Sequence, residues 1–483
     1  MITYINKKHY VYFVIIFSLI FSIFLSFYYI NQYDGYNIDG VTHIMLKEET
    51  FYHWHSGAKI IEQIKNGEFF FTSGEWMFTK PLPQRLVALY SYFTNFSIME
   101  NWEAYKIALG GKFPFLIIQS IAYYFSLFFF YKKISKIFNE YISIFIIFFL
   151  CVEPTLLQYH SSFWTESFYF TIQILLLTFM LDNSEKKIKF LIIGFLLGLL
   201  FIQRSAGIFY VIIVFFYYLF TIKNNKLKKI IFLILPYFLI CLLIGIHNYK
   251  RSNIFYVMPT EGKYGMYKYF AKNILIEAKN LNIDEVNKIE MIKSIEWIRN
   301  NMKNINYKDF ENINSPFEIG LKMINEKDKI KFYEYLNKRS YEILLNDPFI
   351  TFKNVINGFI HFTVLNPFFV YFDYEFYKDY SSSKIGDFVF SQKHKELIPI
   401  RISYSLIVYL ICFVGFIKLT KNNLRLSLLL IASIFYYYLI LGWYGKTRLF
   451  TPCLIYLSVF FGIGSNEILK KLIKSLKIKF ISN

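Results

Sequence analysis

The stretch YVYFVIIFSLIFSIFLSFYYI, residues 10–30, is an unbroken run of apolar, aromatic and small side chains without a charge. About 20 such residues in a helix span the ~30 Å hydrocarbon layer of a bilayer. The run has no small-residue cleavage site and is longer than a signal-peptide core, so we expect a retained transmembrane helix. Lys7 and Lys8 precede it, which predicts that the N-terminus lies in the cytoplasm.

The composition extends this interpretation to the whole chain of 483 residues. Hydrophobic residues make up 55%, aromatic residues 22% and charged residues only 18%, a balance typical of a multi-pass membrane protein. A net charge of +19 would suit nucleic acid, but the basic residues lie in short segments between apolar runs and at the chain ends. We therefore attribute the charge to topology, and the many Phe and Tyr residues to lipid-facing and interfacial positions rather than to a base-stacking surface.

Nine further apolar runs predict an all-α polytopic protein of about ten transmembrane helices with both termini in the cytoplasm. The region near 349–371 would reverse the sidedness of the later basic loops if it crossed, so we interpret it as interfacial or re-entrant. The expected parts are an N-terminal transmembrane helix (1–30), a first extracytoplasmic loop with juxtamembrane helices (31–111), a transmembrane bundle (112–247), a large extracytoplasmic region containing 349–371 (248–399), C-terminal transmembrane helices (400–466) and a basic cytoplasmic tail (467–483).

Helices are also expected in the two extracytoplasmic regions. In the first, a helix over about 49–65 should end at Asn66-Gly67, because glycine favours a helix stop. In the second, Asp284 is expected to cap an amphipathic helix. The residues predicted to share its apolar face are Val286, Ile289, Ile292, Ile295, Ile298 and Met302.

With this topology, several ionisable residues meet on the extracytoplasmic side. Charges at membrane depth are costly, so pairing or ligand contact is the first hypothesis for them, and snorkelling into the headgroup layer is the alternative. Arginines clamp phosphate through paired N–H donors, and a carboxylate can deprotonate a hydroxyl. The set suits a phosphate-linked substrate held partly in lipid, and it comprises Glu48, Glu49, Lys80, Arg85, Glu153, His160, Glu166, Arg204 and Arg448.

Five segments, in one order over nearly the whole chain, resemble motifs of the GT-C membrane glycosyltransferases. The group they resemble most is that of protein mannosyltransferases and aminoarabinose lipid A transferases. The matching segments are EETFYHWHSGAKIIEQIKNG (48–67), TKPLPQRLVALYSYF (79–93), EPTLLQYHSSFWTES (153–167), GFLLGLLFIQRSAG (194–207) and TRLFTPCLIYL (447–457). The resemblance implies a GT-C-like helical bundle that transfers a sugar from a polyprenyl-phosphate donor outside the membrane, usually with inversion.

When the family's motif is matched to this sequence position by position, Glu48 stands where the family has its catalytic Asp. Glu49 aligns with the acid that follows it. A glutamate is one methylene longer than an aspartate and could shift the base by ~1 Å, which can cost about 100-fold in rate. The alternatives are a compensating pocket, Glu49 as the base, Asp39 as the base, or an inactive copy. The residues implied in substrate binding are Tyr52, Lys80, Arg85, Glu166, Arg204 and Arg448.

A metal site in the first loop is a competing interpretation. His43, His53 and His55 flank the acidic pair, and Glu49 with His53 forms an i,i+4 pair on one helical face. However, His53 and His55 are two positions apart and point to different faces of a helix. We therefore expect interfacial histidines, with neither a metal nor another cofactor.

The expected function is sugar transfer from a polyprenyl-phosphate carrier to a glycan, lipid or protein acceptor on the extracytoplasmic face. The expected location is a plasma membrane, or the inner membrane of a bacterium, with lipid and no nucleic acid as partner. A polymerase or ligase of lipid-linked glycans is one alternative. A transporter or flippase of lipid-linked sugars is another, although it predicts inverted repeats that we do not find in the sequence. An inactive scaffold is the third.

The predicted topology can be tested with single cysteines introduced into the loops. A membrane-impermeant thiol reagent added from outside should label cysteines at Ser73 and Asn312, but not at Asn224 or Ser475, because the basic loops are held in the cytoplasm. External labelling at Asn224 would overturn the orientation.

Overall fold

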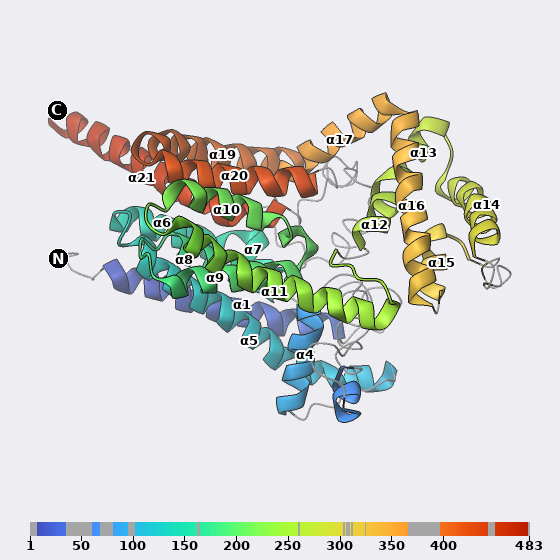
Figure 1. The fold of residues 1–483 in the computed structure, drawn as a ribbon. Coiled ribbons are helices and arrows are strands. Elements are labelled where there is room, and N and C mark those ends of the chain that lie inside the picture. The colour runs from blue at the N-terminus through green and yellow to red at the C-terminus, as the bar shows by residue number, and fades with distance from the viewer. Residues whose placement is uncertain are drawn as a thin grey trace.

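The computed structural model describes residues 7–34, 60–67, 81–94, 102–161, 165–258, 261–302, 305, 310, 313–323, 325–365, 397–442 and 450–481. Within these ranges the regular structure is entirely helical. A bundle of long helices lying side by side forms one part, and a smaller helical lobe lies at one end of it (Figure 1).

Six helices in the described part of the chain are long and apolar enough to cross a membrane. They are α1 (Lys7–Asp34), α5 (Trp102–Ile134), α11 (Lys226–Ser252), α19 (Leu397–Asn422), α20 (Leu424–Leu441) and α21 (Thr451–Ile481). The remaining apolar runs of the sequence are the shorter helices α6 (Glu140–Val152), α8 (Thr165–Met180), α9 (Lys187–Gln203) and α10 (Tyr210–Thr221). The protein is therefore a polytopic helical membrane protein.

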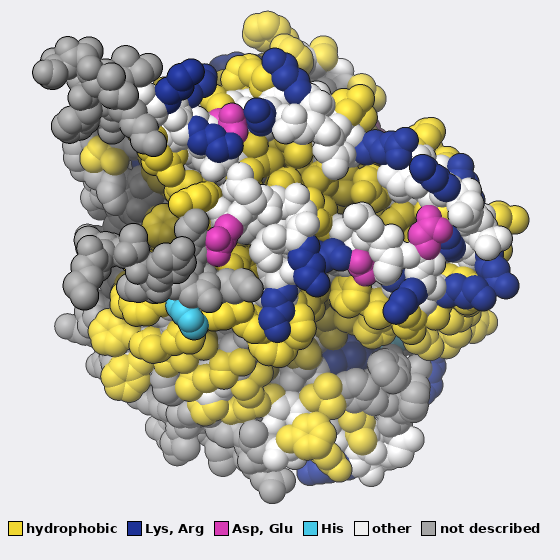
Figure 2. All heavy atoms as spheres, turned by 90° about the vertical axis from the view of Figure 1, so that its left-hand side faces the viewer, with side chains coloured by type: hydrophobic (Ala, Val, Ile, Leu, Met, Phe, Trp, Pro, Cys, Tyr) yellow, Lys and Arg dark blue, Asp and Glu magenta, His cyan; other side chains and the backbone are white. Residues whose placement is uncertain are grey.

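Basic residues gather at the end of the bundle where both termini lie (Figures 1 and 2). Lysines at the ends of α5, α9, α11 and α19, with Lys470, Lys471 and Lys474 of α21, supply this charge. Two ion pairs join neighbouring segments there, Lys133–Asp182 and Lys229–Glu185, each with N···O of 2.5 Å. The structure thus places at one end the basic loops that the sequence predicts to share one side of the membrane.

Close approach of helices depends on glycine. A Cβ on Gly415 of α19 would overlap the carbonyl oxygen of Phe460 in α21, and one on Gly464 would overlap the carbonyl of Ile411. Gly194 of α9 stands in the same relation to Leu233 of α11. In lipid the hydrophobic effect does not drive helices together, so van der Waals packing must contribute more. Small residues allow the close backbone approach that this packing needs.

The lobe consists of α12 (Glu261–Met266), a π-helical turn η3 (Tyr267–Ala271), α13 (Lys272–Lys279), α14 (Ile283–Asn301), α15 (Pro316–Lys322) and α16 (Glu326–Asn346). It has a hydrophobic core of its own, which includes Tyr267, Ile274, Phe332 and Tyr333. The predicted amphipathic helix is α14, but its cap is Asn282 rather than Asp284. The Asn282 side chain accepts from the N–H groups of Asp284 and Glu285, and Glu285 completes the capping box.

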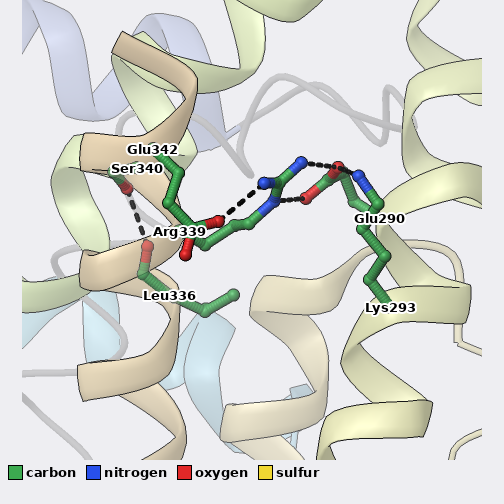
Figure 3. A network of polar contacts seen from close by, with 6 residues as sticks. All are labelled: Glu290, Lys293, Leu336, Arg339, Ser340 and Glu342. Carbon is green, nitrogen blue, oxygen red and sulfur yellow. Dashed lines mark hydrogen bonds and ion pairs between the residues drawn. The ribbon is translucent and has the colours of Figure 1, made fainter. Parts of the chain in front are cut away.

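The buried face of α14 is rotated from the predicted stripe. Val286 and Ile298 are buried as expected, but Ile292 is 68% exposed and Glu290 is 2% exposed. Arg339 of α16 explains this rotation, since its Nε and Nη2 each donate to Glu290 at 2.9 Å (Figure 3). Burial opposes ionisation of Glu290, but hydrogen bonds and charge from Arg339 and Lys293 hold its pKa below the usual value.

Helix α17 (Pro348–Thr363) joins the lobe to the bundle (Figure 1). Phe349, Phe352, Ile356 and Ile360 form an exposed apolar stripe, while the opposite side carries the buried Phe362. This two-faced helix is not among the candidate spans. The interfacial or re-entrant placement of 349–371 stays a prediction, and residues 366–371 lie outside the described ranges.

In the predicted first extracytoplasmic loop, residues 60–65 are helical and the helix ends at Asn66-Gly67 as predicted. Gly67 has φ of +85°, a left-handed conformation that glycine adopts readily, and its N–H donates to the Ile64 carbonyl. The preceding residues 49–59 of the predicted helix lie outside the described ranges.

Two glycine-to-alanine variants test the helix contact. Gly415→Ala should destabilise the protein by about 1–3 kcal/mol, because the new methyl group meets backbone that cannot move aside. Gly245→Ala in α11 is the matched control, since the atoms nearest to its methyl belong to the ring of Phe255, an exposed side chain that can move aside. The control should be neutral or gain up to about 1 kcal/mol of helix propensity. Equal unfolding temperatures of the two variants in detergent would refute the close contact.

Candidate functional site

The candidate site residues fall into two groups. Glu48, Glu49, Tyr52, Lys80 and Arg448 lie outside the described residues, as do Asp39 and the three histidines of the metal interpretation, so their roles stay predictions. Arg85, Glu166 and Arg204 are described, and all three are buried. The structural account of the site is built from these three residues.

Glu166 and Arg204 form a buried ion pair. Glu166 lies in the first turn of α8, and Arg204 ends α9 in extended backbone with φ −151° and ψ 136°. Arg204 Nη1 lies 2.7 Å from Glu166 Oε1, and the two side chains are 10% and 0% exposed. Burial of either charge alone would be very costly, so the pair stabilises both groups and holds Arg204 in one orientation.

The chain breaks between α9 and α10, immediately after Arg204. A 3₁₀ turn, η2 (Ser205–Gly207), links the two helices, and a Cβ at Gly207 would overlap the Leu200 carbonyl. Gly207 therefore permits the chain to fold back closely on α9. The break leaves backbone groups that helix hydrogen bonds do not satisfy, and because Ala206 and Gly207 are buried, other protein groups must satisfy them.

Tyrosines from two other helices satisfy that broken backbone. Tyr436 of α20 donates its hydroxyl to the Ala206 carbonyl at 2.6 Å and accepts from the Phe209 N–H at 3.1 Å. Tyr237 of α11 donates to the Ile208 carbonyl at 2.6 Å. The segment carrying Arg204 is thus attached by hydrogen bonds to both neighbouring helices.

A layer of buried tyrosines continues beside the pair. Tyr169 of α8 has its ring centroid 5.9 Å from the Arg204 guanidinium carbon, and its hydroxyl lies 2.7 Å from that of Tyr437. Tyr210 pairs with Ser433 at 2.8 Å. The interpretation of the aromatic residues as lipid-facing and interfacial is wrong for these tyrosines, because their hydroxyl groups find partners inside the bundle. The run of three tyrosines at 436–438 was a signal of this in the sequence.

Glu153 and His160 have structural partners. Glu153 lies between α6 and α7 (Pro154–Ser161), and its carboxylate accepts from the Leu156 N–H at 2.8 Å as a cap. His160 lies 2.7 Å from the Ser167 hydroxyl and stacks on Tyr123 with ring centroids 3.4 Å apart. Both residues are buried, and these contacts hold α7 against α5 and α8.

Arg85 lies on α4 (Pro81–Thr94) and is 6% exposed. Residues of this helix pack with Phe115 of α5 and Phe168 of α8, and α4 also contacts α9. Phe168 is two residues from Glu166, so α4 joins the same end of α8 and α9 as the ion pair. The structure therefore brings the helices that carry Arg85, Glu166 and Arg204 together at the end opposite the basic face (Figure 1).

The described residues contain no group of three or more His, Cys, Asp or Glu side chains placed to hold a metal ion. The acids and histidines of the first-loop metal interpretation are outside these residues. At the candidate site, Arg204 is buried beside the Glu166 carboxylate, and Tyr436 and Tyr237 bind the backbone that follows it. A cation held in this way suits contact with an anionic group.

No family model and no curated protein matches the chain. Two solved structures that are similar to it are of the oligosaccharyltransferase from Archaeoglobus fulgidus, one in the apo form and one in complex with an inhibitory peptide and a dolichol-phosphate. Each has a TM-score of 0.44 and 12% sequence identity, over 96% and 99% of this chain. The chain spans about half of their length, 52% in both cases.

A pair of matched glutamine variants tests the energetic importance of the ion pair. Glu166→Gln leaves the Arg204 charge buried without its carboxylate and should destabilise the protein by about 3–5 kcal/mol. Glu277→Gln removes one carboxylate from the exposed Lys353 pair and should cost about 1 kcal/mol or less. Thermal unfolding in detergent measures both, and equal losses would contradict a buried, interacting pair.

Proposed function

We propose that the protein is a membrane glycosyltransferase that moves a sugar from a polyprenyl-phosphate donor to an acceptor on the extracytoplasmic face. The observation that carries the proposal is the ordered set of five GT-C-like motifs along the chain. In support, residues from two of these motifs, Glu166 and Arg204, meet as a buried ion pair although they lie 38 positions apart in the sequence.

In the proposed reaction, an acceptor hydroxyl attacks the anomeric carbon of the sugar. The new glycosidic bond forms as the bond from that carbon to the phosphate oxygen breaks, and polyprenyl phosphate leaves with the bonding electrons. Glu48 takes the hydroxyl proton as general base. Negative charge grows on the phosphate as the bond breaks, so cations placed beforehand near it lower the barrier.

The cations proposed to meet the phosphate are Lys80, Arg85, Arg204 and Arg448. Arg204 is the one whose orientation the described contacts explain, since Glu166 and the tyrosine-bound turn hold it. Its guanidinium presents several N–H donors, so one edge can pair with Glu166 while another meets a phosphate oxygen. Glu49 and Tyr52 are proposed to support the segment that carries Glu48.

The sugar and acceptor are to be identified first, by mass analysis of cell-surface glycans and lipids with and without the gene. Purified protein is then assayed for release of polyprenyl phosphate from the corresponding donor. Glu48→Gln should lower the rate by about 10²–10⁴-fold, because the amide has the shape of the acid but accepts no proton.

Three further variants separate the alternatives in the same assay. Glu48→Asp should keep some activity if the pocket tolerates a shorter reach, and Glu49→Gln should do less harm than Glu48→Gln. If Asp39→Asn loses activity while Glu48→Gln stays active, the general base is Asp39 rather than Glu48. If every variant transfers sugar at the normal rate, catalysis does not occur in this loop.

A further inference from the structure

A cavity of about 300 Å³ lies between α10 and α20, on the half of the bundle near the basic end. Apolar and aromatic side chains from both helices form most of its wall, among them Phe216, Phe220, Leu428 and Ala432. Phe216 and Leu428 are 50% and 58% exposed, so the cavity opens on the outer surface of the bundle that faces lipid. Hydrocarbon rather than water is the medium that such a groove meets in a membrane.

Arg425 is the one charged residue in the cavity wall. It lies in the first turn of α20, exposed, and within the described ranges it forms no ion pair with a carboxylate. Tyr217 and Thr221 supply the other polar side-chain groups of the wall. The Thr221 hydroxyl donates to the Tyr217 carbonyl at 2.8 Å. The guanidinium donors of Arg425 are thus available at the mouth of an apolar groove.

The surroundings carry charge of the same sign. Lys223 and Lys226 follow α10 in the sequence, and Lys418 and Lys421 precede α20. Figure 2 shows the basic side chains over this end of the molecule, with few acidic ones between them. Such a face attracts anionic headgroups, and basic pockets between transmembrane helices bind them.

We propose that this groove is a binding site for an anionic phospholipid of the cytoplasmic leaflet. One acyl chain lies between α10 and α20, and the phosphate accepts hydrogen bonds from the Arg425 guanidinium. The leaflet follows from the predicted topology, in which the basic loops face the cytoplasm. The site lies at the end of the bundle opposite the Glu166–Arg204 pair, so it does not depend on the proposed sugar transfer.

Native mass spectrometry of the full chain in detergent measures the binding directly. Phosphatidylglycerol and phosphatidylcholine with identical acyl chains are the two probes. Arg425→Gln should weaken binding of phosphatidylglycerol by about fivefold, the contribution of one basic residue near an anionic lipid surface. Lys421→Gln removes a charge from the same end outside the cavity wall and is the matched control, expected to change binding less.

A second pair of variants tests the groove itself. Ala432→Phe fills it and should reduce phosphatidylglycerol binding, while Ile431→Phe, on the neighbouring residue outside the wall, should leave binding unchanged. Equal binding of the two lipids by the unaltered protein would overturn the proposal, since it would show only unspecific contact with hydrocarbon. Unchanged phosphatidylglycerol binding in Arg425→Gln would also overturn it, and this exposed substitution does not depend on repacking of the core.

Discussion

A backbone polar group that is buried in the protein needs a hydrogen-bond partner there, and this constraint shapes the end of the bundle opposite the basic face. The chain interrupts its helix after Arg204, at the residue where a charge is also buried. Tyr436 and Tyr237 supply hydrogen bonds to the interrupted backbone. The same contacts that satisfy the backbone also restrict the position of Arg204, so stability and orientation of the charge have a common cause.

The helical lobe also buries a charged group, in a hydrophobic core of its own. Its buried Glu290 is neutralised by Arg339 across two helices, and Lys293 adds a third group from one helical turn away. The cost of this arrangement is that α14 turns Ile292 to the surface in order to bury a carboxylate. The lobe therefore has a polar, geometrically specific contact in its core, which favours one register of α14 against α16.

The two ends of the bundle differ in their chemistry. One end collects Lys and Arg around α10, α20 and α21, and many of these side chains are exposed. At the other end, Arg85, Glu166 and Arg204 are buried among helices that include α4, α8 and α9. Contact with anionic lipid suits exposed, flexible cations, whereas a reaction on a lipid phosphate suits cations that are already oriented. This asymmetry is what separates the proposed lipid site from the proposed reaction site.

The sequence by itself determined the membrane class, the ten apolar runs, the gathering of basic loops on one side and the stop of the first-loop helix at Gly67. These features are local, because hydrophobic length, loop charge and glycine conformation act within a few residues. The sequence also singled out Arg85, Glu166 and Arg204 as candidate site residues, but it did not predict that Glu166 and Arg204 form an ion pair. Only the tertiary structure decided that pair, the tyrosine contacts to residues 206–209 and the rotation of α14 by Arg339. Each of these depends on groups far apart in the chain, and the cost of burying a charge or a carbonyl is known only once its neighbours are in place.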